Sequence, residues 1–389
     1  MSLDPCGSQY SILTTKKSMK TLKPAFFFAI ILFIQIHITA CKESFLDSLD
    51  LPDEIELTHL PVDLSQMLDY GPIGQIRVIP KMHGGFRLLN PFVLPASVPV
   101  YAMGDGYIVN IEKEFRTIPP HGPPDLVGTD YDDFTLDIVY TKDVGGYYAH
   151  ISALHEDILE QAGRIREGRG RGNQVKIKIT SGQIVGYIGP HEGVDIGMYD
   201  YSRESYFANP QWYSRDYRST VCYTDYLPAP LVEQIWEINP RTAEPRCGRV
   251  AYDKEGTVAG NWFLEGAKEI NEWSKQLVFA RHELYGDQIT IVDASPLVDG
   301  DGMLNDGRDP YLWFVLGNEP EPESITVDSG VVKFEVAAPW RILRYGDPPV
   351  EGTVMVQLID SKTLRYEWFE DKLASEVSGF TGSSKKYVR

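Results

Sequence analysis

The sequence predicts a mainly β protein of two domains, and three observations support this class. Apolar and polar residues alternate along Phe134–Tyr140 and again along Val175–Ile179, which is the period of half-buried strands. The chain has 389 residues, enough for two domains of ordinary size. All seven tryptophans lie after residue 200, so the two halves are built differently.

The first 40 residues are predicted to be an export signal. Four lysines between residues 16 and 23 precede the apolar run Ala25–Ile36, which is shorter than the roughly 20 residues of a membrane span. Cys41 directly follows the small residue Ala40, and this junction resembles the lipobox of bacterial lipoproteins, whose cysteine is lipidated. We therefore expect a lipid-anchored protein of the cell envelope, outside the cytoplasm, with Met19 as an alternative start.

The next segments are predicted from their composition. Residues 41–60 are acidic and poor in aromatics, and we interpret them as a tether between the anchor and the first domain. Residues 61–200 show short strand patterns between glycine-rich turns. Within them, Thr117–Asp133 and Gly163–Gly172 are predicted loops, and His155–Gln161 is predicted to form one or two helical turns. The first domain should therefore be an antiparallel β domain.

Residues 201–389 are predicted to form a second β-rich domain, either a small barrel or a curved sheet. Strand-like runs dominate it, with helices expected at Leu231–Ile238 and Ala267–Lys275. The motif Gly260–Phe263 resembles the opening strand of a small barrel such as a lipocalin. A carrier of a hydrophobic ligand in this barrel is therefore one functional hypothesis.

Charge and cysteine content exclude several classes of function. Acidic residues outnumber basic ones 55 to 37, giving a formal charge of -18 that would repel nucleic-acid backbones. The four cysteines include no CxxC pair, so a structural zinc site of that type is not expected. Outside the cytoplasm Cys222 and Cys247 could form a disulfide, although their spacing alone does not establish it.

Three segments in one order carry a family resemblance. They are Pro99–Phe115 (PVYAMGDGYIVNIEKEF), Gly145–Leu154 (GGYYAHISAL) and Ser181–Gly197 (SGQIVGYIGPHEGVDIG). Together with a preceding His-bearing turn they resemble the lysostaphin/LytM-type zinc endopeptidases, which cut peptidoglycan cross-links, over about residues 78–200. The resemblance implies a site with one zinc held by two imidazoles and a carboxylate, a fourth position for water, and two further catalytic histidines.

The match to the family's site residues is incomplete. His83 stands at the first metal-ligand position, and His150 and His191 stand at the two catalytic positions. Arg87 occupies the place of the carboxylate ligand, where a guanidinium would oppose a dication. Gly193 replaces the last ligand histidine. Two of the three expected ligands are therefore missing.

We accordingly expect a degenerate peptidase domain without a cofactor, which binds peptidoglycan or a cell-wall hydrolase and contacts the membrane through its N-terminal lipid. The alternative is an active zinc endopeptidase that combines His83 with two of Glu192, Asp195 and Asn90, with His150 and His191 as catalytic groups. Glu192 and Asp195 flank the vacant position, but strand alternation does not by itself direct either of them into the groove.

Overall fold

The computed structural model describes residues 45–74, 80–168, 170, 172–268, 270, 272–294, 312–339 and 349–389. The chain divides into two compact units, Met1–Asp53 and Glu54–Arg389, and the second contains the β-sheets and the barrel. The predicted export signal and the predicted lipidation site Cys41 lie outside the described residues. None of the helices in the described ranges combines the length and apolar character that a membrane span requires.

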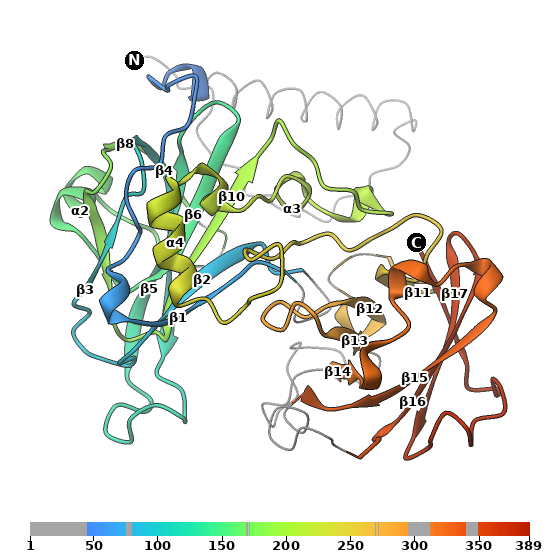
Figure 1. The fold of residues 1–389 in the computed structure, drawn as a ribbon. Helices are drawn as coiled ribbons and strands as arrows, with labels where there is room; N and C mark the ends of the chain where they lie inside the picture. The colour runs from blue at the N-terminus through green and yellow to red at the C-terminus, as the bar shows by residue number, and fades with distance from the viewer. Residues whose placement is uncertain are drawn as a thin grey trace, which may run out of the picture. The chain divides into compact units, whose positions relative to one another are not determined.

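The first half of the second unit is antiparallel β-structure, as the sequence predicted (Figure 1). Its larger sheet holds, in spatial order, β1 (Met67–Gly71), β2 (His83–Leu88), β10 (Gly193–Asp200), β6 (Val144–Ile151), β5 (Asp130–Val139), β4 (Gly106–Thr117) and β8 (Asn173–Ile179). A smaller sheet holds β3 (Val98–Tyr101), β9 (Ile184–Ile188) and β7 (Ala153–Leu154). Buried residues of both sheets, among them Ile108, Tyr148 and Val185, share one core.

The hairpin of β4 and β5 is longer than the sequence predicted. Its strands pair from Tyr107 opposite Val139 to Thr117 opposite Asp130, so the end of the predicted loop Thr117–Asp133 belongs to a strand. Neighbouring β8 pairs with β4 only as far as Ile111, and the hairpin extends past it as a two-stranded arm (Figure 1). The predicted helical turns are confirmed as α2 (Glu156–Ala162), which His155 caps by accepting from the Asp157 N–H.

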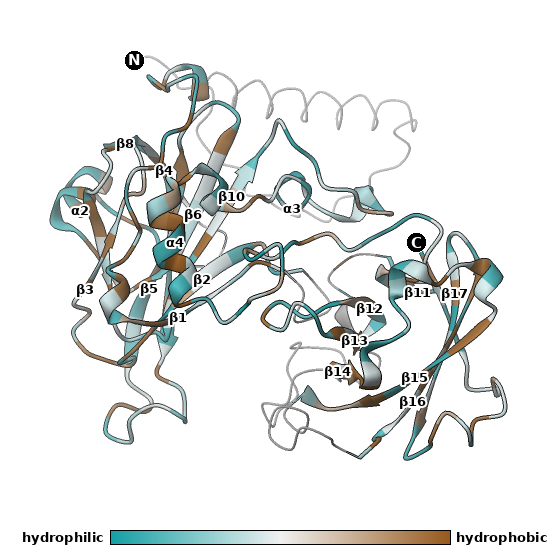
Figure 2. Cartoon of the chain, in the orientation of Figure 1, coloured by the Kyte–Doolittle hydropathy of each residue, from teal (hydrophilic) through white to brown (hydrophobic). Residues whose placement is uncertain are grey.

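The segment after residue 200 remains attached to the first core. It contains α3 (Arg215–Arg218) and α4 (Ala229–Glu237), the second of which confirms the predicted helix. Figure 2 shows apolar and polar residues alternating around α4. Tyr223, Leu227 and Ile235 are buried in the same cluster as the sheet strands. The short 3-10 helices of the described chain are Leu64–Gln66, Pro210–Trp212, Tyr223–Tyr226, Trp273–Lys275, Leu316–Asn318, Pro322–Ser324 and Val327–Ser329.

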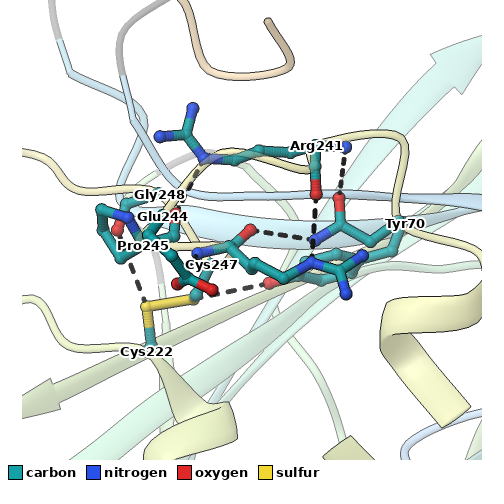
Figure 3. The surroundings of a disulfide bond; sticks show 9 residues. Tyr70, Cys222, Arg241, Glu244, Pro245, Cys247 and Gly248 are labelled. Atoms are coloured by element: carbon teal, nitrogen blue, oxygen red, sulfur yellow. Dashed lines mark hydrogen bonds between the residues drawn. A yellow bond between two sulfur atoms is a disulfide. The ribbon is translucent and has the colours of Figure 1, made fainter. Parts of the chain in front are cut away.

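A disulfide joins Cys222 to Cys247 across 25 positions of sequence, with their Cα atoms 6.2 Å apart. Figure 3 shows its surroundings, where the Tyr70 hydroxyl lies 3.7 Å from the Cys247 sulfur. Nearby, the buried Arg241 donates from Nε to the Pro245 carbonyl at 2.7 Å. The structure therefore contains the Cys222–Cys247 disulfide, which the sequence spacing alone did not establish.

The second half forms a closed antiparallel barrel, the first of the two architectures that the sequence left open. Its strands follow chain order: β11 (Gly260–Leu264), β12 (Gln276–Arg281), β13 (Ile289–Asp293), β14 (Leu312–Val315), β15 (Val331–Ala337), β16 (Gly352–Asp360), β17 (Thr363–Glu370) and β18 (Lys385–Val388). Pairing of β18 with β11 closes the circle. Trp262 is fully buried, donates to the Val258 carbonyl at 2.8 Å and lies beneath the Arg389 guanidinium.

The prediction of a helix at Ala267–Lys275 was wrong. The described part of the expected helix Ala267–Lys275 contains only the 3-10 turn Trp273–Lys275. The expected tether, residues 41–60, is not free at its C-terminal end: Leu57 is buried, and the N–H groups of Thr58 and His59 donate to the Met103 carbonyl. The end of this segment is therefore held against the sheet domain by both its buried side chain and its backbone hydrogen bonds.

Candidate functional site

The exposed face of the larger sheet brings together the strands that carry the predicted site residues. On β10 the residues Val194, Ile196 and Met198 are buried in the core, so alternation places Gly193, Asp195 and Gly197 on the opposite face. Asp195 lies opposite Gly85 of β2 on one side and Ala149 of β6 on the other. His83 and His150 flank the same carboxylate from these two neighbouring strands.

His150 reaches this face through a local break in the strand pattern. Tyr148 is buried in the core, and regular alternation would direct His150 to the core as well. The pairing of β5 with β6 shifts between Phe134 and Leu136, which adds one residue to β6 as a bulge. His150 also has a φ of 68°, a left-handed conformation that is costly for a residue other than glycine. This conformation turns the imidazole to the same side as Tyr147.

Glycines on β2 and β10 leave the space that the larger side chains use. A Cβ atom at Gly197 would lie 2.2 Å from the Tyr147 ring, and one at Gly85 would lie 2.8 Å from the Asp195 carboxylate. Tyr147 can therefore lie across β10 and reach His83, while Asp195 can extend between the two histidines.

The side chains form one continuous hydrogen-bonded chain. The Tyr147 hydroxyl lies 2.8 Å from His83 Nδ1, and His83 Nε2 lies 3.2 Å from Asp195 Oδ2. The same oxygen lies 3.3 Å from His150 Nε2, and His150 Nδ1 lies 3.1 Å from Asp133 Oδ2. Carboxylates only accept hydrogen bonds, so both ring nitrogens of His150 act as donors. His83 donates through Nε2, and its Nδ1 accepts a hydrogen bond from the Tyr147 hydroxyl.

The surroundings determine which groups carry charge. Burial would lower the pKa of His150, but its hydrogen bonds to Asp133 and Asp195 outweigh this and raise the pKa to about 9. Burial would raise the pKa values of the Asp195 and Asp133 carboxyls, yet the adjacent histidines, with Arg116 beside Asp133, lower both. Burial lowers the pKa of His83 despite the charge on Asp195. At neutral pH His150 is therefore an imidazolium between two carboxylates, and His83 is neutral.

His191 lies against His150 but takes no part in the hydrogen-bonded chain of Tyr147, His83, Asp195, His150 and Asp133. The two imidazole rings stack with centroids 3.8 Å apart and planes 10° from parallel. Burial, and then the charge on His150, lower the pKa of His191 to about 4. Its Nδ1 accepts from the Gly193 N–H at 3.4 Å. A neutral ring therefore covers one face of the imidazolium.

A cavity of about 260 Å³ opens at this cluster. Its lining consists of His83, Glu112, Glu114, Arg116, Asp133, Thr135, Tyr147, Ala149, His150 and Asp195. Four carboxylates thus stand against one guanidinium and one imidazolium, so the lining is net negative at neutral pH. Arg116 forms an ion pair with Asp133.

The substitute metal ligands proposed from the sequence separate into two groups. Asp195 lies at the centre of the cluster, and its side chain therefore points into the groove. Glu192 instead pairs with the exposed His121 at 2.9 Å. Asn90 is exposed beyond the end of β2. Only His83 and Asp195 of the proposed substitute set therefore come together.

The family's zinc-ligand pattern does not fit this site. Arg87 points its guanidinium at Asp69, with which it forms a two-point ion pair. A Cβ atom at Gly193 would lie 2.0 Å from the Phe86 carbonyl oxygen, so no histidine has room there. Among the residues that the structure describes, no group of three or more His, Cys, Asp or Glu side chains is arranged to hold a metal ion.

Sequence reasoning identified only His83, His150 and Asp195 and missed the other seven lining residues: Glu112, Glu114, Arg116, Asp133, Thr135, Tyr147 and Ala149. The alternating acids of β4 were a usable indication, because Glu112, Glu114 and Arg116 follow period two and share a face. Asp133 was assigned to a loop. Tyr147 belongs to the segment Gly145–Leu154 of the family resemblance, but its contact with His83 depends on the glycine at position 197 of another strand.

No family model, no curated protein and no solved structure matches this chain. Function must therefore be inferred from the geometry of the site and from the sequence motifs.

Proposed function

We propose that this protein is an exported, lipid-anchored protein of the cell envelope whose sheet region is a LytM-like domain that binds peptidoglycan peptides without hydrolysing them. The observation that carries the proposal is the carboxylate of Asp195, which accepts from the Nε2 atoms of both His83 and His150. These contacts hold the two imidazoles in fixed positions beside a cavity, which is the preorganisation that a binding site needs.

The same hydrogen bonds argue against hydrolysis by these histidines. A general base must accept a proton from water, yet His150 is already protonated at neutral pH and uses both N–H groups. His83 is neutral, but its Nδ1 accepts from Tyr147 and its Nε2 donates to Asp195. Neither imidazole therefore has a free nitrogen with which to activate water.

A sedimentation assay tests the proposal. Purified protein from residue 41 onward is mixed with isolated peptidoglycan sacculi, and the pelleted protein and released peptides are measured. We expect retention without peptide release, and loss of most retention in Asp195→Asn, because the amide lacks the negative charge that pairs with the His150 imidazolium. Glu160→Gln, on the exposed surface of α2, is the matched control and should behave as wild type.

The outcomes separate the hypotheses for this domain. Release of peptides from sacculi would overturn the non-hydrolytic function. Absence of retention, combined with capture of a purified cell-wall hydrolase, would replace the peptidoglycan ligand with a hydrolase partner. Retention that is equal in wild type and Asp195→Asn would remove the site from the explanation.

Lipid attachment at Cys41 is a separate part of the proposal, supported by the sequence junction at Ala40 and Cys41. Mass spectrometry of the mature N-terminal peptide should find an acylated Cys41, and Cys41→Ser should release the protein from membranes. Recovery of an unmodified Cys41 within a longer N-terminal peptide would contradict the anchor.

An active zinc endopeptidase remains the second candidate, because one feature favours it. The outer nitrogens of His83 and His150 are held by Tyr147 and Asp133, as the outer nitrogens of metal-bound histidines usually are. In the present arrangement both inner nitrogens donate to Asp195, so zinc binding would require both imidazoles to release these protons. Stoichiometric zinc in the purified protein, lost in His83→Ala, would favour this candidate over the binding function.

A carrier of a hydrophobic ligand is the third candidate, favoured by the closed eight-stranded barrel. Barrels of this size are either filled by side chains or hold one small ligand. In the described residues Trp262, Phe279, Phe334 and Tyr366 fill much of the interior and are almost completely buried. Organic extraction followed by mass spectrometry should recover no stoichiometric lipid, and its recovery would favour the carrier.

A further inference from the structure

The cavity is bounded on one side by the part of the β4–β5 hairpin that extends beyond the end of β8. Glu112, Glu114 and Arg116 alternate along β4 and share one face. Glu112 pairs with Thr135 and Glu114 with Asp133 across the hairpin, and all four line the cavity. The arm therefore sets two glutamates opposite the histidine cluster.

The positive groups of the lining are already paired with the aspartates. Arg116 forms its ion pair with Asp133, and His150 donates to both Asp133 and Asp195. Glu112 is half-buried, and in the part of the chain that the structure describes no hydrogen bond or ion pair engages its carboxylate. A half-buried carboxylate without a partner favours a cation brought by a ligand.

The size of the cavity limits what that cation can be. About 260 Å³ lies just below the usual range for small-molecule pockets, which begins at about 300 Å³. The space suits the end of one side chain better than a disaccharide or a folded peptide. Tyr147 adds an aromatic wall beside which an alkyl chain can lie.

We infer that the cavity binds a primary ammonium group, namely the side-chain amine of the diamino acid in a peptidoglycan stem peptide, with Glu112 as its ion-pair partner. This inference rests on the proposed binding of peptidoglycan peptides and adds the group that is recognised. The alkyl chain lies along Tyr147, and the ammonium replaces water at Glu112.

Calorimetric titration with two synthetic peptides tests the inference. The first is the stem tetrapeptide L-Ala–D-Glu–L-Lys–D-Ala joined through the γ-carboxyl of glutamate, and the second is identical but acetylated on the lysine side chain. We expect the acetylated peptide to bind at least about tenfold more weakly, since it lacks the charge that meets Glu112.

Matched variants locate the effect. Glu112→Gln should weaken the amine-bearing peptide by about the same factor and leave the acetylated peptide unchanged, because only the charge pair is removed. Glu160→Gln on α2 removes the same single negative charge at a site away from the cavity, and it should leave the affinities for both peptides unchanged. Thermal denaturation of both variants verifies that they are folded.

Each result distinguishes this inference from the function on which it rests. Equal affinity for the two peptides, or an unaltered preference in Glu112→Gln, overturns ammonium recognition while retention on sacculi still supports peptidoglycan binding. Absence of binding to both peptides also overturns ammonium recognition when sacculi retain the protein. Absence of binding to peptides and sacculi alike overturns the proposed function as well.

Discussion

The face of the larger sheet and the interior of the barrel are both made of antiparallel strands, yet they use them in opposite ways. Glycines at positions 85 and 197 open space on the sheet, and the polar side chains of Asp195 and Tyr147 occupy it while staying partly exposed. The barrel interior is filled by residues such as Trp262 and Phe279, which are fully buried. Close packing of apolar side chains in the barrel interior thus contributes to stability. On the sheet face, close packing is replaced by the polar side chains of the candidate site.

The most destabilising substitution should lie in the barrel. Trp262→Ala removes a fully buried ring, its hydrogen bond to Val258 and its contact with Arg389. We expect it to lower the free energy of unfolding by about 3–5 kcal/mol in urea titrations. Val331→Ala, at an exposed position of β15, is the control and should change it by less than about 0.5 kcal/mol. Similar losses in both variants would contradict a packed barrel.

The next prediction concerns the room left on the sheet face. The double variant Arg87→Asp with Gly193→His introduces the ligand residues of the LytM-type pattern, but the new Cβ at 193 would lie 2.0 Å from the Phe86 oxygen. We expect a loss of about 1–3 kcal/mol in stability and no stoichiometric zinc by elemental analysis. Arg87→Asp alone separates the charge change from the clash. One tightly bound zinc per double-variant chain would show that the strands can move apart.

A smaller effect should appear in the titration of the two stacked histidines. Nuclear magnetic resonance of the imidazole protons should give pKa values of about 9 for His150 and about 4 for His191. Because the pKa of His150 is raised on folding, its stabilising contribution is complete below the unfolded value of about 6.5 and is lost as pH rises through about 9.

Removal of one carboxylate checks the cause of that titration. Asp133→Asn should lower the pKa of His150 toward its ordinary value, since one of its two anionic partners is lost. The site geometry is contradicted if both histidines titrate near 6.5 in the wild type.

The mildest substitution distinguishes two acids that lie close together in the sequence. Glu192 and its partner His121 have exposed side chains, so Glu192→Ala should change stability by less than about 0.5 kcal/mol. Asp195→Ala removes the acceptor of two imidazoles and should cost more, as well as abolishing retention on sacculi. Equal costs in the two variants would mean that the cluster adds nothing beyond a surface ion pair.

Much of the fold was readable from the sequence because it depends on local pattern. The alternation in Phe134–Tyr140 and the helix expected at Leu231–Ile238 appear in the structure as part of β5 and as α4. The helix expected at 267–275 was wrong because a helix-compatible composition does not guarantee a helix. The burial of Leu57, at the end of the expected tether, was not foreseen because its neighbours in the sequence are acidic.

The site was only partly predictable, because its geometry depends on contacts between strands. His83, His150 and His191 were found from motifs, and the structure places them in one cluster. The role of Asp195 depends on register with Gly85, which one sequence does not reveal. The orientation of His150 depends on a bulge in β6.

The burial of Tyr223, Leu227 and Ile235 with the strands of the sheet limits how this chain could recombine during evolution. The last strand of the sheet in chain order, β10, ends at Asp200. A module that stopped at this residue would leave an apolar surface of the sheet uncovered. The exchangeable piece must extend through α4, whose buried side complements that surface. The segment that can be exchanged as one module is therefore longer than the sheet itself and includes α4.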